Sequence, residues 1–83
     1  MDIEHLVAMA NQIGKFYESL PDRTESLASV ANHIRRFWDP RMRRAIFTHI
    51  ADHAGRGLDP LVHEALLAHQ ATLMPPPPRG APA

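Results

Sequence analysis

The stretch that decides the fold covers residues 35–44 and reads Arg35-Arg36-Phe37-Trp38-Asp39-Pro40-Arg41-Met42-Arg43-Arg44. Its centre, Asp39-Pro40, ends one helix and starts another, because a residue that precedes proline is pushed out of the α region. Aspartate is a preferred N-cap residue, and proline is favoured at the first helical position. The stretch therefore predicts two helices that meet at a corner.

Apolar residues recur every three or four positions on both sides of this corner, as they do on one face of an amphipathic helix. Asp59-Pro60 repeats the capping signal of Asp39-Pro40, and a glycine of the turn at 55–57 is expected to supply the left-handed conformation that ends the third helix. The predicted helices run from about Asp2 to Leu20, from Asp22 or Thr24 to Trp38, from Pro40 to the turn at 55–57, and from Pro60 to about Leu73.

The predicted fold class is all-α, with three to four short amphipathic helices in a small bundle. Residues 1–73 form the helical domain, and residues 74–83 form a flexible tail, because the four prolines at 75–78 cannot continue a helix. In the first helix, Ala10 and Gly14 form a pair of small residues one turn apart. Since glycine costs about 1 kcal/mol in a helix, we expect another element to approach closely there.

Composition limits the classes of function. The chain has 83 residues, no cysteine, and nine basic residues against nine acidic ones. A chain of this size has a thin core, and without cysteine it forms neither disulfides nor thiolate metal sites. No stretch has the length of a membrane span, and Asp2 and Glu4 are not typical of a signal peptide, so we expect a cytoplasmic protein. Its neutral balance argues against general binding of nucleic acid.

The arginines of the stretch fall into two groups. Arg35 and Arg36 lie in the last turn of the second helix, where the helix dipole favours cations. The other three, Arg41, Arg43 and Arg44, lie in the first turns of the third helix, where the dipole disfavours them. Pairing with the acidic residues of the first helix is one explanation, and contact with an acidic surface of another protein is the alternative that we favour.

A protein-binding surface would combine this stretch with apolar residues that lie off the main helical faces. Arginine and tryptophan dominate protein interfaces, although Trp38 fits a core position equally well. The candidate partner-binding residues are Arg35, Arg36, Phe37, Trp38, Arg41, Arg43, Arg44, Met9, Phe16 and Phe47.

Catalytic and metal-binding patterns are weak. His49 and His53 have the spacing of two ligands on one helical face, but Ile50 stands where a metalloprotease has glutamate, and no third ligand is evident. The serines lack a glycine-rich elbow, and no phosphate-binding glycine motif is present. We therefore expect no catalytic, cofactor-binding or metal-binding residue in this chain.

Several segments resemble one protein family, and they are residues 9–14 (MANQIG), 20–23 (LPDR), 30–33 (VANH), 34–44 (IRRFWDPRMRR) and 57–60 (GLDP). The chain is similar to the delta subunit of soluble, NAD-dependent, molybdenum-containing formate dehydrogenases over residues 1 to about 70. The resemblance implies a small non-catalytic subunit of a cytoplasmic complex. It also implies that the partner subunits carry the molybdopterin-dinucleotide, iron-sulfur clusters, flavin and NAD, and that this chain carries none.

On this resemblance, the expected partner is the large catalytic subunit, and the expected role is to support its assembly or stability. The alternatives are a dissociable maturation chaperone of the same enzyme and a small helical nucleic-acid-binding module.

Overall fold

The computed structural model describes residues 2–75, and this part of the chain is helical without strands. The all-α fold class is therefore confirmed. The predicted tail of residues 74–83 lies outside the described residues except for Met74 and Pro75. The helices are α1 (Ile3–Tyr17), α2 (Arg23–Phe37), α3 (Pro40–His53), α4 (Pro60–Ala68) and α5 (Gln70–Leu73).

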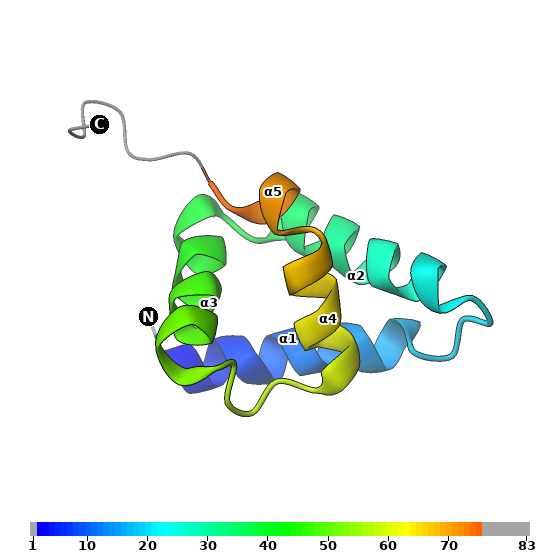
Figure 1. Cartoon of the computed structure of the whole chain (residues 1–83), viewed down its shortest axis with the longest axis horizontal. Helices are drawn as coiled ribbons and strands as arrows, with labels where there is room; N and C mark the ends of the chain where they lie inside the picture. The colour runs from blue at the N-terminus through cyan, green and yellow to red at the C-terminus, as the bar shows by residue number, and fades with distance from the viewer. Residues whose placement is uncertain (1, 76–83) are drawn as a thin grey trace.

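The helices enclose one core. As Figure 1 shows, α1 and α2 run in opposite directions, α3 crosses the start of α1, and α4 packs against both α1 and α2. The short α5 lies against α2. Their inward faces provide the buried apolar residues, which are Leu6, Ala10, Val30, Ala31, Ile34, Trp38, Ile46, Phe47, Leu61, Val62, Ala65, Leu66 and Leu73.

Aspartate side chains begin three of the helices. Backbone N–H groups of Glu4, Thr24 and Met42 donate to Asp2, Asp22 and Asp39 respectively, each at 3.0 Å. Both predicted prolines, Pro40 and Pro60, lie in the first turn of their helices. Asp59 occupies the predicted N-cap position of α4, although its side chain makes no capping hydrogen bond.

The side chain of Asn11 in α1 binds the backbone of the loop between α3 and α4. Its amide nitrogen donates to the carbonyl of Gly57 at 2.9 Å, and its amide oxygen accepts from the backbone N–H of Asp59 at 2.8 Å. One side chain therefore satisfies both a donor and an acceptor of the α3–α4 loop and fixes that loop to α1.

The close approach predicted at Gly14 is present. Gly14 is buried, and a Cβ atom at this position would overlap Cγ2 of Val62 in α4. The absence of a side chain thus lets α4 pack directly on the backbone of α1, which offsets the conformational cost of a helical glycine.

Three predicted helix ends need correction. The first helix ends at Tyr17 and not at Leu20, and the second ends one residue before Trp38. The predicted fourth helix is interrupted at His69, where φ is −112° and ψ is 19°. This break changes the direction of the chain and allows Leu73, in α5, to be fully buried.

The end of α3 differs from the expected glycine cap. Ala54 adopts the left-handed conformation, with φ of 55° and ψ of 28°, and Gly55 follows with φ of 69°. The pattern Gly-x-Gly correctly predicts a left-handed turn, but it begins one residue earlier than predicted, at a residue that carries a Cβ atom. An L-residue pays about 1–2 kcal/mol for this conformation.

Replacing Ala54 by glycine is therefore expected to stabilise the chain by about 0.5–1 kcal/mol, because relief of the left-handed strain exceeds the added freedom of glycine in the unfolded chain. Chemical denaturation monitored by circular dichroism measures the change. Ala51→Gly, at an exposed position within the same helix, is the control and should be destabilising by a similar amount. Loss of stability in both variants would contradict the prediction.

Candidate protein-binding surface

The corner at Trp38-Asp39-Pro40 places the arginines of residues 35–44 on two helices. Arg35 and Arg36 are exposed in the last turn of α2, and Arg41 is exposed in the first turn of α3. Arg44 is half-buried. The five arginines of the stretch therefore differ in exposure, because three are exposed and the other two, Arg43 and Arg44, are half-buried.

Arg43 is half-buried and reaches from α3 to the end of α5. Its guanidinium donates from Nη1 to the carbonyl of Leu73 at 3.2 Å, and its Nε is buried without a hydrogen-bond partner among the described residues. The side chain joins α3 to the end of α5. Its role in partner binding stays a prediction, and the structure gives this side chain a contact within the fold.

Internal ion pairing does not explain the exposed arginines. Within residues 2–75, no ion pair links Arg35, Arg36 or Arg41 to an acid of α1, whereas Arg23 and Glu64 pair at 2.9 Å. The hydrogen bond between these two side chains lowers the pKa of Glu64 and raises that of Arg23. Any stability from this pair is present above the ordinary glutamate pKa and is lost as the pH falls through the lowered one, and its exposure keeps it small.

Two predicted contact aromatics lie in the core. Trp38 is 4% exposed and Phe47 is 3% exposed. The sequence allowed Trp38 as a core residue or as a contact residue, and its burial places it in the core. Phe47 was expected on the outside, but it is buried beside Ile46. The predicted face is otherwise present, since Met42, Ala45 and Ile50 pack against the core, so the buried face of α3 is wider than predicted.

Phe16 and Phe37 remain on the surface, with 77% and 67% of their area exposed. They lie at the two ends of a row of rings. The ring centroids are 4.9 Å apart from Phe16 to Tyr17, 6.2 Å from Tyr17 to His33, and 4.7 Å from His33 to Phe37. The guanidinium of Arg36 lies 5.8 Å from the centroid of Phe37, within the range of a cation–π contact.

A groove of about 360 Å³ lies beside this row, and we call it the aromatic groove. Half-buried Met9 lies on one of its walls, as expected for a residue off the centre of the α1 stripe. Sequence reasoning missed His33, whose signal is its position one turn before Phe37 on α2. The aromatic groove is lined by Met9, Gln12, Ile13, Phe16, His33, Phe37, Trp38 and Met42.

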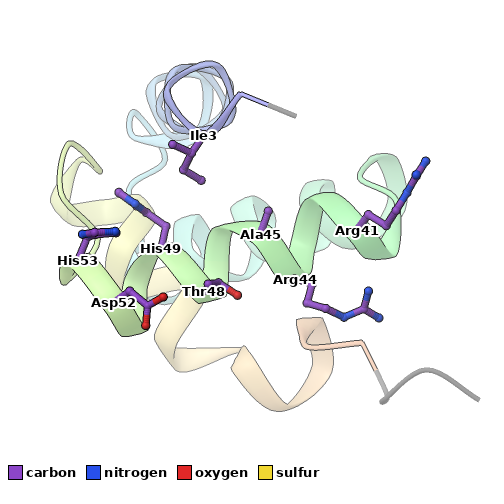
Figure 2. Close-up of a pocket in the computed structure, with 8 residues that line it drawn as sticks. All are labelled: Ile3, Arg41, Arg44, Ala45, Thr48, His49, Asp52 and His53. Atoms are coloured by element: carbon purple, nitrogen blue, oxygen red, sulfur yellow. The ribbon is translucent and has the colours of Figure 1, made fainter. Parts of the chain in front are cut away.

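A second hollow of about 510 Å³ lies between the start of α1 and the outer face of α3. Figure 2 shows Ile3 directed from α1 toward α3, while the guanidinium groups of Arg41 and Arg44 extend away from the opposite end of the helix. His49 Nε2 lies 2.7 Å from the carbonyl oxygen of Arg56. Because a carbonyl only accepts, this nitrogen carries the proton and holds the turn after α3.

The histidine pair does not form a metal centre in the described structure. The rings of His49 and His53 lie 5.6 Å apart, and residues 2–75 contain no group of three or more His, Cys, Asp or Glu residues placed to hold a metal ion. With no cysteine in the chain, the residues present also do not fit an iron-sulfur cluster.

Comparison with protein families matches residues 5–66 to the family described as the NADH-dependent formate dehydrogenase delta subunit, FdsD. The chain belongs to this delta-subunit family. The match covers most of α1, all of α2 and α3, and most of α4, and so includes the whole arginine stretch and the aromatic groove. Comparisons with curated proteins and with solved structures gave no match.

Membership in the delta-subunit family confirms the resemblance seen in the sequence. A formate dehydrogenase subunit has partner subunits within its complex. Among the described residues, no helix is both long and apolar enough to span a membrane.

Proposed function

We propose that this chain is a non-catalytic accessory subunit that binds the large molybdenum-containing catalytic subunit of a cytoplasmic NAD-dependent formate dehydrogenase and supports its assembly or stability. The observation that carries the proposal is the family match over residues 5–66. The chemistry, oxidation of formate to carbon dioxide with NAD, takes place in the other subunits.

The surface of the chain supports a binding role. Phe16 and Phe37 leave most of their rings in water, and the exposed Arg36 lies over the ring of Phe37. Exposed aromatic residues next to arginine are typical of the centre and rim of a protein interface. The molybdopterin-dinucleotide, iron-sulfur clusters, flavin and NAD belong to the partner subunits in this proposal, in keeping with the lack of cysteine here.

We expect the chain to co-purify with formate dehydrogenase at about one copy per catalytic subunit. The experiment places an affinity tag on the catalytic subunit, isolates the mature enzyme, and measures the subunit ratio by quantitative mass spectrometry. Mature, fully active enzyme without this chain would reject a stable subunit. If the chain were instead bound only to catalytic subunit that lacks its molybdenum cofactor, the maturation chaperone would replace it as the function.

A further inference from the structure

The aromatic groove is an apolar surface that the fold of this chain leaves open. Its two walls come from α1 and α2, and the α2–α3 corner closes one end. Phe16 and Phe37 stand at its rims with most of their area in water, although a chain of this size has few large apolar residues for its core. A contiguous apolar groove with aromatic rims is the kind of surface that marks an interaction site.

A positive charge lies at the rim of the groove. None of its lining residues is acidic, and Arg36 lies over the Phe37 ring at the rim. Within the described residues, Arg36 has no ion-pair partner. A segment that fills the groove would therefore be complementary if it carried apolar residues on one face and a carboxylate beside Arg36.

The architecture decides the conformation of that segment. Residues 2–75 contain no strand, so they offer no sheet edge to which an extended peptide could add. Grooves for polyproline segments present the ring and the polar atom of Trp or Tyr, whereas Trp38 is 4% exposed here and the rim residues are phenylalanines. A groove between two helices with long, adaptable side chains such as Met9 and Met42 is instead typical of one that receives a helix.

We propose that the aromatic groove receives an amphipathic helix of the partner subunit, with its apolar face between Phe16 and Phe37 and an acidic residue beside Arg36. This inference rests on the proposed function and specifies the surface and the class of segment by which the chain binds. In this arrangement α1 and α2 provide two walls, and the partner helix lies between them as a further helix of the bundle.

The first test titrates formate dehydrogenase purified from a strain lacking this chain with the full-length chain and its variants. Phe16→Ser combined with Phe37→Ser is expected to raise Kd more than 100-fold, since truncation of a central interface aromatic typically costs about 30-fold. Leu67→Ser is the matched control, because Leu67 is a half-exposed apolar residue of α4 outside the groove. Its Kd should stay within about threefold of the unmodified chain.

Circular dichroism should show the same helix content and unfolding midpoint, within a few degrees, for all these variants, since the rings removed are exposed. If the Phe16→Ser/Phe37→Ser variant bound as tightly as the unmodified chain, the groove would not be the binding site. The proposed function would remain intact. No binding by the unmodified chain would remove the proposed function itself.

A second test identifies the occupant and the charge at the rim. A photo-reactive amino acid at Gln12, an exposed residue of the groove, is expected to cross-link to partner positions three or four residues apart, the spacing of one helical face. Cross-links to a second copy of this chain or to its own residues 76–83 would contradict the proposal that a partner helix occupies the groove. Arg36→Glu should weaken binding about tenfold and Arg36→Lys much less, and equal affinity for Arg36→Glu would reject the acidic residue.

Discussion

Replacing Phe47 by alanine should destabilise the chain by about 3–5 kcal/mol, the range for removing a buried phenylalanine side chain. The ring is 3% exposed and joins the core cluster from α3, and few other residues of α3 are fully buried. Small domains have a total stability of about 5–15 kcal/mol, so this loss removes a large share of the stability of a chain with a core this small. Urea denaturation at 25 °C, or thermal unfolding where the variant is too unstable, measures the change.

Phe37→Ala is the matched control, since it removes the same chemical group from the same protein at a position that is 67% exposed. Its cost should be within about 1 kcal/mol, because the transfer of exposed apolar area contributes little and what remains is the contact with His33 and Arg36. A similar loss in both variants would mean that Phe47 does not pack as the structure places it.

Gly14→Ala is expected to destabilise the chain by about 1–2 kcal/mol, although alanine is the better helix former by about 1 kcal/mol. The new methyl group would overlap Cγ2 of Val62, which is fully buried and, being β-branched, has little rotamer freedom with which to move away. The overlap therefore forces α4 away from α1. The measurement is the free energy of unfolding in urea.

Val62→Ala separates the steric cost at Gly14 from any other effect. In the Val62→Ala background the clash is absent, so Gly14→Ala should become neutral or stabilising, and the coupling between the two sites should exceed about 1 kcal/mol. Additive losses would instead show that the two positions do not touch. Ala8→Gly, at an exposed position of the same helix, measures the helix propensity of glycine without the contact.

Local signals in the sequence predicted the helices and several of their ends. Asp39 and Pro40 act through backbone geometry and a short-range hydrogen bond, so residue type and order are enough to place them. The small pair Ala10 and Gly14 likewise predicted a close approach, since a helical glycine needs a compensating contact.

Positions that depend on distant elements could not be predicted in this way. The width of the face that α3 buries is set by the elements that pack against it, and it includes Phe47 in addition to the predicted residues. Only the packed structure shows that Phe47 lies inside and that Arg43 reaches the carbonyl of Leu73. Asn11 is similar, because its two partners follow it by more than 40 residues.

The hydrogen bond from Arg43 to Leu73 fixes the end of α5 beside the first half of α3, which can be followed with a pair of fluorescent labels. Ile3 lies against His49 and His53 in the second half of α3, whereas the last described residues lie beside its first half. The start of α1 and the end of α5 therefore lie against opposite halves of α3, a helix about 20 Å long at ~1.5 Å per residue. Labels on the exposed residues Glu4 and Met74 would report by energy transfer whether α5 stays docked.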